Sequence, residues 1–344
     1  MPNNPEIYIL AIESSCDDTS AAVLYNDVVL SNVVANQKIH SEFGGVVPEL
    51  ASRAHQQNIV PVVHQALQKA NIVKNQLKAI AFTKGPGLMG SLLVGTSFAK
   101  SMAQALDIPY IGVNHMQGHI LAHFIKHDNY KKPDFPFLCL TISGGHTEIV
   151  KVNNYFEMEI LGETLDDAVG EAFDKSAKIL GLDYPGGPLI DEYAKKGNPK
   201  AFKFSKPSVS GLNFSFSGLK TGILYFVQKE TKKNSNFISE NIYDICASIQ
   251  AVIVAILMEK LEAAVQKTGI KQVAIAGGVS ANSEIRKQLL EMEQKKGWKT
   301  FIPKFEYTTD NAAMIGIVGY LKYLADSYNR NESNATARLS VEKE

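Results

Sequence analysis

The sequence has little of several features that would assign a protein to a familiar class. Its three cysteines, Cys16, Cys139 and Cys246, are too few and too far apart for a disulfide framework or a zinc ribbon. The longest apolar runs, such as the one within residues 250–258, are far shorter than a membrane-spanning helix requires. The N-terminal residues MPNNPEIYIL lack the basic start and the small-residue cleavage site of a secretory signal. We therefore expect a cytoplasmic protein with no membrane association.

Net charge and arginine are also scarce. The 35 Lys and Arg residues balance 35 Asp and Glu residues, and only four of the basic residues are arginine. A neutral chain has no global field that attracts nucleic acid, so such binding has to use a local patch or another subunit. The few arginines argue against bidentate readout of bases. With 45% apolar and 20% charged residues, the composition predicts a soluble enzyme or binding protein.

The chain of 344 residues is long enough for two domains, and its pattern predicts two similarly built halves. In the first half, a strand at 6–13 leads into the polar turn SSCDDTS. A helix at 48–70, a strand at 79–87 that enters a Gly-Pro-Gly loop, and a second helix at 91–106 follow. In the second half, strands at 135–142 and 147–152 flank the turn SGGH. Helices at 162–180 and 238–269 and a strand–turn–helix unit at 271–292 follow. Polar connections are expected at 153–160 and 229–241. This shared layout indicates an internal duplication.

Four histidines are spaced by four residues, at His115, His119, His123 and His127. On a helix, side chains four residues apart share one face, close enough for two imidazoles to bind one metal ion. A polar or half-buried helix face is the more common reason for such spacing. A zinc protease would carry glutamate after the first histidine, whereas Met116 follows here. The spacing therefore leaves a metal site without its third ligand, for which Asp310 is a candidate that the sequence alone cannot place.

Glycine-rich turns are a second candidate for a site. The turn SGGHTE at 143–148 would let backbone N–H groups approach phosphate or carbonyl oxygens, although an ordinary hairpin uses the same residues. The segment AGGVSAN at 276–282 opens a helix, where its residues are more often structural. The acidic turn ESSCDDT at 13–19 is harder to explain structurally, because carboxylates between two apolar strands often mark the phosphate or metal edge of a site.

In combination, the motifs resemble the tRNA N6-adenosine threonylcarbamoyltransferase family, formerly described as a glycoprotease family. The resemblance covers residues 7–325 and rests on nine motifs in the family's order. They are IESSCDDTSAAV, HSEFGGVVPELASRAH, GPGLMGSLLVG, NHMQGH, TISGGHTE, GEAFDKSAKILGLDYPGGP, FSFSGLKT, AGGVSAN and TDNAAM.

The resemblance implies an α/β fold of the actin-like ATPase (ASKHA, ribonuclease H-like) type, with two duplicated lobes and a cleft between them. By this resemblance, residues 7–130 form the N-terminal lobe, completed by a C-terminal helix at 312–328, and residues 131–311 form the C-terminal lobe. Residues 329–344, which lack an apolar period, are expected to be a disordered tail.

The same resemblance implies the site residues. The metal ligands carried over are His115, His119 and Asp310, while His123 and His127 lie outside the family motif. The metal would be one divalent ion per subunit, Fe²⁺ by the family's usage, with Zn²⁺ compatible with the ligand types. The substrate contacts carried over are Thr141, Ile142, Ser143, Gly144, Gly145, Asp174, Gly187, Asp191 and Asn282. No general base is assigned.

The implied reaction moves a threonylcarbamoyl group from threonylcarbamoyl-AMP to the N6 amine of adenosine 37 in tRNA, releasing AMP. Implied partners are tRNA, a non-catalytic paralogous subunit (TsaB-like) and a small P-loop ATPase (TsaE-like). Three alternatives remain: a small-molecule kinase on the same fold, a metalloendopeptidase, and a non-catalytic scaffold subunit. The missing glutamate after His115 argues against the peptidase, and the three metal ligands together with AGGVSAN argue against the scaffold.

Overall fold

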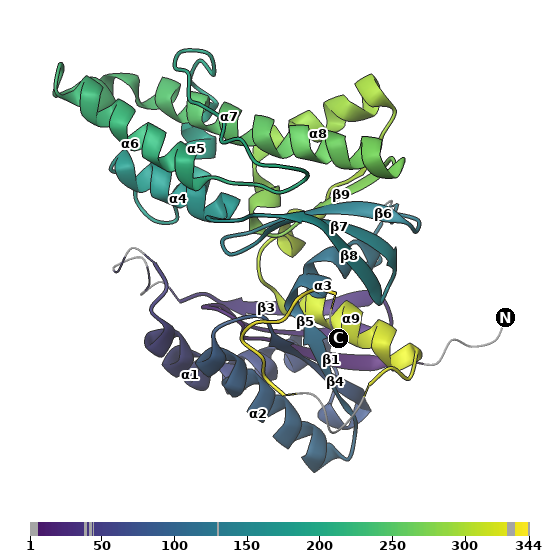
Figure 1. Ribbon diagram of the computed structural model, residues 1–344. Coiled ribbons are helices and arrows are strands. Elements are labelled where there is room, and N and C mark those ends of the chain that lie inside the picture. Colours follow the sequence, from purple (N-terminus) through teal and green to yellow (C-terminus); the bar gives the residue numbers. More distant parts are fainter. Residues whose placement is uncertain are drawn as a thin grey trace. The chain divides into compact units, whose positions relative to one another are not determined.

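The computed structural model describes residues 6–37, 40, 43, 45–128, 131–328 and 334–342. It divides into two compact units, one comprising Met1–Lys132 with Pro303–Glu344 and the other comprising Pro133–Ile302 (Figure 1). The sequence assigned residues 303–311 to the second lobe, whereas they belong to the first unit. This difference matters because Asp310 then lies in the same unit as the histidines.

The first unit is built on a five-stranded sheet of order β3-β2-β1-β4-β5. The strands are β1 (Tyr8–Glu13), β2 (Thr19–Tyr25), β3 (Val28–Ala35), β4 (Leu77–Gly85) and β5 (Tyr110–Asn114). β1, β2 and β3 pair antiparallel, whereas β4 and β5 run parallel to β1. The polar turn between β1 and β2 therefore lies at the edge where the parallel strands also end, which is where ligands bind in open α/β sheets.

Successive strand residues point to opposite faces of the sheet, and helices cover both of these faces. Leu10 and Ile12 belong to a core cluster that includes residues of α1 (Pro48–Ala70) and α2 (Met89–Leu106). Ala11 lies between them in β1 and approaches α9 (Ala312–Leu324), where a Cβ on Gly316 would lie 3.2 Å from the Ala11 side chain. The short helices of the unit are α3 (His115–Leu121), η2 (Lys74–Gln76), η3 (Ala122–Phe124) and η5 (Phe305–Tyr307).

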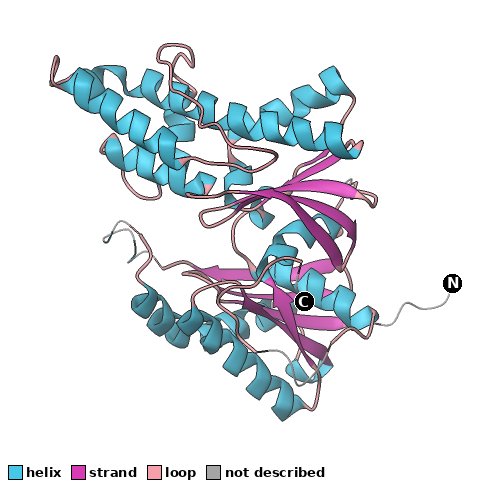
Figure 2. Cartoon of the chain, viewed as in Figure 1, coloured by secondary structure: helices cyan, strands magenta, loops and turns pink. Residues whose placement is uncertain are grey.

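The second unit repeats the topology in a sheet of order β10-β9-β6-β7-β8 (Figure 2). Its strands are β6 (Phe137–Ile142), β7 (Thr147–Asn154), β8 (Glu157–Glu163), β9 (Gln272–Ala276) and β10 (Lys299–Phe301). Its helices are α4 (Val169–Ile179), α5 (Gly186–Ala194), α6 (Ser217–Thr231), α7 (Phe237–Thr268), α8 (Ser283–Lys296) and η4 (Gly278–Ala281). In both sheets three antiparallel strands are followed by two parallel ones, as the predicted duplication requires.

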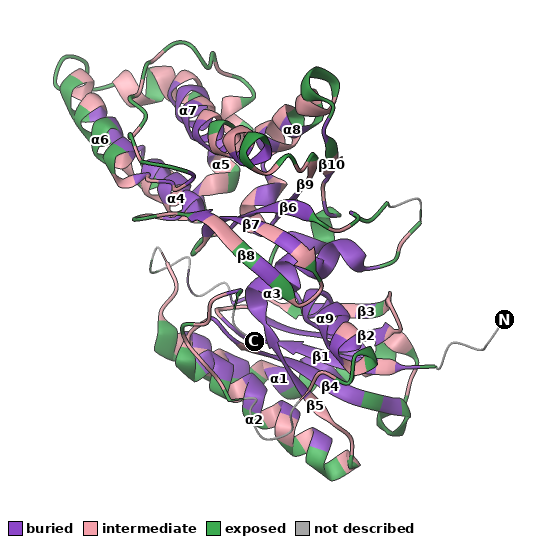
Figure 3. Ribbon diagram, turned by 45° about the vertical axis from the view of Figure 1, so that its right-hand side comes forward, coloured by how far each residue is buried: buried purple, intermediate pink, exposed green. Residues whose placement is uncertain are grey.

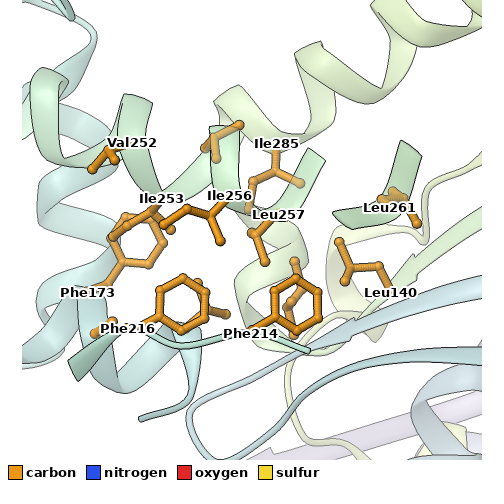
Figure 4. Packing of buried hydrophobic residues seen from close by; sticks show 14 of the residues in the cluster. Leu140, Phe173, Phe214, Phe216, Val252, Ile253, Ile256, Leu257, Leu261 and Ile285 are labelled. Carbon is orange, nitrogen blue, oxygen red and sulfur yellow. The ribbon is translucent and has the colours of Figure 1, made fainter. Parts of the chain in front are cut away.

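α7 is the core helix of the second unit. By length and composition it could cross a membrane, but 67% of its most apolar window is buried inside the unit. Figure 4 shows Ile253, Ile256 and Leu257 of this helix packing toward Phe214 and Phe216. Gly269 ends the helix in the left-handed conformation, as its place in the sequence predicts.

Two local predictions are wrong. The helix expected over 162–180 begins only at Val169, because the residues before it complete β8 and a turn. The polar connections expected at 153–160 and 229–241 contain most of β8, the end of α6 and the start of α7. β8 is an edge strand whose acidic side chains face solvent, so it resembles a polar loop in the sequence.

The C-terminal segment Asn334–Glu342, which we call the C-terminal strap, is ordered rather than disordered as the sequence suggested; the rest of that predicted tail, residues 329–333 and 343–344, lies outside the described residues. Thr336 N–H donates to the Lys84 carbonyl (2.7 Å), and Gly87 N–H donates to the Ala337 carbonyl (3.1 Å). Val341 is 2% exposed. The strap is therefore an integral part of the first unit, beside the loop that follows β4.

Candidate functional site

The two histidines are presented by the start of α3, directly after β5. Asn114 caps the helix, because its side-chain oxygen accepts hydrogen bonds from Met116 N–H (2.9 Å) and Gln117 N–H (3.4 Å). His115 and His119 follow one helical turn apart, and their rings meet edge to face with centroids 4.7 Å apart. Both side chains are buried, so their rotamers are constrained by packing.

Asp310 joins the histidines from the segment before α9. Its Oδ1 lies 3.1 Å from His119 Nε2 and 3.4 Å from His115 Nε2. Gly118 allows this approach: a Cβ there would lie 3.1 Å from Ile315 and 3.3 Å from Met314, which belong to the first turn of α9. The absence of a side chain at Gly118 thus lets α9 pack closely on α3 and brings Asp310 to the imidazoles.

These three residues form the group that could hold a metal ion among the residues that the structure describes. One donor atom from each lies within 4.8 Å of the others. Two imidazole nitrogens and one carboxylate oxygen suit a borderline divalent cation such as Fe²⁺ or Zn²⁺, and three protein donors leave coordination positions open. The donor set and its burial therefore fit the metal site expected from the sequence.

Glu13 and Ser15 support His115 from the opposite side. Glu13 Oε2 lies 3.1 Å from His115 Nδ1 and also accepts a hydrogen bond from Thr83 Oγ1 (2.5 Å), while Ser15 Oγ lies 3.2 Å from the same His115 nitrogen. A carboxylate behind a ligating imidazole fixes the ring and raises its basicity. Sequence reasoning marked the acidic turn at Glu13 but did not connect it with His115, because the two are 102 residues apart.

The three charged groups shift one another's pKa values. Burial disfavours a charged imidazole, yet Asp310 and Glu13 on either side hold the pKa of His115 well above its usual value. Burial raises the pKa of Asp310, but His115 and His119 outweigh it and hold that pKa well below the usual range. The pKa of Glu13 is likewise lowered by His115 against the effect of burial. Two ionised carboxylates thus lie around a buried imidazole, and their negative charge favours the binding of a cation at this site.

The expected ladder of four histidines is interrupted. α3 ends at Leu121, so the regular spacing that would align His123 and His127 with the pair is lost. The prediction that these two are not ligands stays a prediction, and neither belongs to the group with Asp310.

The acidic turn and the Gly-Pro-Gly loop pack against each other. Leu88 N–H donates to the Ser15 carbonyl (2.7 Å), and a Cβ on Gly87 would lie 2.4 Å from that same oxygen. A Cβ on Gly95 would lie 2.3 Å from Ser14 Oγ. Because these glycines of the motif GPGLMGSLLVG have no side chain, the loop and α2 can pack closely against the turn that carries Glu13 and Ser15.

Asp18 in this turn gives a pH prediction. Burial and the neighbouring charge of Asp17 raise the pKa of Asp18 to about 7. Since the pKa is near 4 in the unfolded chain, the stability that this group contributes is fully present below about pH 4 and is lost as the pH rises through about 7. We expect Asp18→Asn to stabilise the metal-free protein more at pH 8 than at pH 5, by about 1–3 kcal/mol after allowance for partial exposure.

Urea denaturation at the two pH values measures this difference. Asp107→Asn is the matched control, since Asp107 is exposed at the end of α2 and lies outside this turn. An Asp18→Asn effect that is equal at pH 5 and pH 8 would contradict the assignment.

The predicted substrate contacts all lie in the second unit, and the first five, residues 141–145, lie at the carboxyl end of β6. The side chains of Thr141 and Ile142 are fully buried in the sheet, so only their backbone could contact a ligand. Ser143 Oγ accepts hydrogen bonds from the N–H groups of Gly145 (3.3 Å) and His146 (3.0 Å), which closes the turn. Gly144 and Gly145 are exposed, and a Cβ at either would meet no atom within 4 Å. The turn is therefore open to a ligand oxygen.

Asp174 and Gly187 are in direct contact. Asp174 Oδ1 accepts hydrogen bonds from Gly186 N–H (2.8 Å) and Gly187 N–H (3.0 Å), the first residues of α5. Burial raises the pKa of Asp174, although these two donors work in the opposite direction. Among the described residues no hydrogen bond reaches Asp174 Oδ2, which leaves that oxygen available.

Asn282 directly precedes α8, and Asp191 of α5 contacts the first residue of that helix. Asn282 caps α8 through Glu284 N–H and Ile285 N–H, both at 3.1 Å, and donates from Nδ2 to Gln250 Oε1 (2.9 Å). Asp191 accepts a hydrogen bond from the Ser283 hydroxyl (2.7 Å).

The loop before α8 reaches back to β6. A Cβ on Gly277, whose φ is +87°, would lie 2.5 Å from the Ile142 carbonyl oxygen. A Cβ on Gly170, in the first turn of α4, would likewise lie 2.6 Å from the Ser143 carbonyl oxygen. The turn after β6, the start of α4 and the η4 loop thus converge, and the predicted contacts form a connected group within the second unit.

Comparisons with known proteins agree with this organisation. A sequence model of the family described as tRNA N6-adenosine threonylcarbamoyltransferase matches residues 28–317. A protein of that name from Christiangramia forsetii is 71% identical over 326 residues, covering 95% of this chain and 96% of the relative. One from Riemerella anatipestifer is 63% identical over 333 residues, covering 97% of this chain and 98% of the relative.

Solved structures support the fold. HypF from T. kodakarensis is similar with a TM-score of 0.62 at 17% identity, over 96% of this chain and 50% of HypF. Full-length HypF in its phosphate- and nucleotide-bound form gives 0.61 at 12% identity, over 94% of this chain and 47% of HypF. This chain thus spans about half the length of those chains, and the likeness concerns the fold alone. Together with the duplicated sheets, it confirms the predicted actin-like ATPase fold.

Proposed function

The chain belongs to the tRNA N6-adenosine threonylcarbamoyltransferase family, and from this membership we propose how it works on its substrates. The protein is a transferase that moves the threonylcarbamoyl group from threonylcarbamoyl-AMP to the N6 amine of adenosine 37, in tRNAs reading codons that begin with A. The single observation that carries this function is the family match over residues 28–317, supported by relatives of 63–71% identity over nearly the whole chain.

The reaction exchanges one bond to the carbamoyl carbon for another. The N6 nitrogen attacks that carbon and forms a C–N bond, the C–O bond to the AMP phosphate breaks, and AMP leaves with the electron pair while N6 loses a proton. The donor is a mixed anhydride, so no covalent enzyme intermediate is needed. The N6 lone pair is delocalised into the purine, which makes it a poor nucleophile, and catalysis therefore depends on positioning and on stabilising charge at the carbamoyl oxygen.

We propose that His115, His119 and Asp310 hold one divalent metal ion, with Fe²⁺ as the expected metal and Zn²⁺ as the alternative. Such an ion supplies Lewis-acid stabilisation of developing negative charge when bound. Glu13 and Ser15 orient His115 through its Nδ1, so that Nε2 points toward Asp310.

In the second unit, we propose that backbone N–H groups of the turn Thr141–Gly145 receive phosphate or threonyl oxygens of the donor. Gly144 and Gly145 support this role, because nothing covers the positions their side chains would take. The free Oδ2 of Asp174 suits a ribose hydroxyl, and its Oδ1 fixes the backbone at Gly187. We propose that Asp191 and Asn282 shape the region of the second unit that receives the rest of the donor's nucleoside, beyond this hydroxyl. Both side chains form hydrogen bonds with the start of α8.

Two further proposals concern the cellular setting. We propose that the protein acts in the cytoplasm, in keeping with a family of soluble tRNA-modifying enzymes. We also propose that it works with other subunits, because a neutral chain with four arginines has limited charge for holding tRNA by itself. The family resemblance implies that these are a non-catalytic paralogous subunit and a small P-loop ATPase.

The test is transfer from purified threonylcarbamoyl-AMP to unmodified tRNA, with and without the two partner proteins. We expect AMP release matched by threonylcarbamoylated adenosine, which mass spectrometry of digested tRNA detects, and no product on a tRNA with guanosine at position 37. ATP-dependent phosphorylation of a small molecule without modified tRNA would instead identify a kinase. Absence of modified adenosine under every condition would refute the proposed function.

A further inference from the structure

Positive charge is concentrated in one segment of the otherwise neutral chain. Residues 195–239 contain nine lysines and one acidic residue, Glu230, although the whole chain carries 35 basic and 35 acidic residues. We call six of these lysines the basic face: Lys196, Lys200, Lys203, Lys229, Lys232 and Lys233. All six are exposed. A local patch of this kind is what a neutral protein needs if it is to bind nucleic acid.

The first part of the basic face lies against the start of α7. Asn198 N–H donates to Asp244 Oδ1 (2.7 Å), and Phe202 N–H donates to Ser248 Oγ (3.1 Å). Lys196 Nζ lies 5.5 Å from the centre of the Tyr243 ring. The segment after α5 is therefore fixed along the first turns of α7 and presents its lysines from a defined backbone.

An aromatic cluster joins this segment to the end of α6. The Phe202 ring lies 5.1 Å from Phe226 of α6 and 5.7 Å from Phe237 at the start of α7, and Phe204 lies 5.4 Å from Phe226. Lys203, between the two phenylalanines, is thereby brought beside the helix that carries Lys229. These ring contacts hold the segment after α5 against α6 and the start of α7, so we treat the two parts as one face.

Nearby carboxylates leave most of this charge uncompensated. Glu230 pairs with Lys233, Glu240 accepts a hydrogen bond from Asn234, and Asp244 accepts one from Asn198. In contrast, no carboxylate of the described residues forms an ion pair with four lysines, namely Lys200, Lys203, Lys229 and Lys232. Figure 3 shows exposed residues along α6, the helix that carries Lys229.

The chemistry of the face fits an RNA backbone. Lysine contacts phosphate as a point charge without reading bases, which suits an enzyme that accepts several tRNAs. Tyr225, 65% exposed, lies four residues before Lys229 on α6 and so shares its side of the helix. An exposed ring among lysines provides a stacking surface for an unpaired base.

The face also continues from the candidate substrate site. α5 carries Gly187 and Asp191, and Lys195 at its end forms an ion pair with Asp191 at 3.3 Å. We infer that the basic face binds the phosphate backbone of the substrate tRNA and thereby delivers it to the second unit. This inference rests on the proposed function, because it takes tRNA as the substrate.

The test compares two triple variants in tRNA binding at several salt concentrations. The first is Lys203→Gln/Lys229→Gln/Lys232→Gln. The control is Lys267→Gln/Lys271→Gln/Lys299→Gln, three exposed lysines at the far end of α7, directly before β9 and at the start of β10. None of the three forms an ion pair among the described residues. We expect the first variant to bind unmodified tRNA about tenfold more weakly near 100 mM salt, with the slope of log K against log salt reduced by about 2. The control should match the wild type, and both variants should keep the wild-type melting temperature.

The outcomes separate this inference from the proposed function. If the wild type modifies tRNA and the first triple variant binds tRNA with the wild-type affinity and salt slope, the basic face is not the RNA surface. If the variant keeps tRNA affinity but loses binding to one of the partner proteins, the face serves a protein instead, and the inference is equally overturned. If the wild type modifies no tRNA under any condition, the proposed function itself fails.

Discussion

Asp310→Asn should abolish tight metal binding while leaving the fold intact. The amide has the same size as the carboxylate but carries no charge, so it is a much weaker ligand for a divalent cation than the oxygen that lies 3.1 and 3.4 Å from the two imidazoles. We expect affinity for Fe²⁺ or Zn²⁺ to fall by at least about 100-fold, since even outer partners of metal ligands are worth 10–100-fold. Threonylcarbamoyl transfer should fall by a similar factor. Metal content of the reconstituted protein and titration against a competing chelator measure the affinity directly.

A matched histidine provides the control for this experiment. His127→Gln removes an imidazole from the same sequence ladder but outside the group of three, so metal affinity and transfer should stay at the wild-type level. Wild-type metal stoichiometry and affinity in Asp310→Asn would show that the three residues do not form the site. If metal is lost but transfer is retained, the Lewis-acid role fails while the family assignment stands.

The sequence was informative where a structural cue was local. The helix over Pro48–Ala70 begins at a proline and shows a regular apolar period, and the strand–glycine–helix unit at 271–292 has clear boundaries, so both were predicted closely. β8 was missed because an edge strand with solvent-facing glutamates has the composition of a loop. The start of α4 was placed too early because Asp166 looked like a helical residue, whereas it caps α6 by accepting hydrogen bonds from Phe216 N–H (2.7 Å) and the Ser217 hydroxyl (2.7 Å).

The candidate site shows the same limit more sharply. The four-residue spacing of His115 and His119 is a local signal and could be read from the sequence. Asp310 is 191 residues from His119, and only the resemblance to a family suggested it as a ligand. Glu13 was seen as part of an acidic turn, but its contact with His115 depends on the pairing of β1 with β4 and of β4 with β5. Such contacts follow from the topology of the sheet and have no signal at any fixed spacing.

Deleting residues 334–344, which include the C-terminal strap, should destabilise the first unit and weaken its candidate metal site. Asn114 Nδ2 donates to the Ser340 carbonyl (2.8 Å), and Gln117 Nε2 donates to the Val341 carbonyl (3.3 Å). Asn114 is also the cap of α3, so the strap holds the residue that sets the direction of the histidine helix. Burial of Val341 and these hydrogen bonds are partly offset by the entropy of ordering the segment, so we expect a net loss of about 2–4 kcal/mol.

The same deletion should lower metal affinity by about 10-fold, because the ligands remain but their orientation is less constrained. Chelator competition and urea denaturation of the same preparation measure the two effects together. An unchanged affinity would show that α3 is held in place without the strap.

Gly85→Ala tests the same contact from the opposite side. Gly85 has φ of +149°, and a Cβ there would lie 1.9 Å from the Thr336 carbonyl oxygen, so alanine cannot be accommodated while the strap is in place. In the full chain the substitution should therefore displace the strap and reproduce most of the effect of the deletion. In the deleted chain it should cost only backbone strain, of about 1 kcal/mol. The difference between these two costs is the coupling energy of a double-mutant cycle, and a value near zero would contradict the strap's role because the two changes would then act independently.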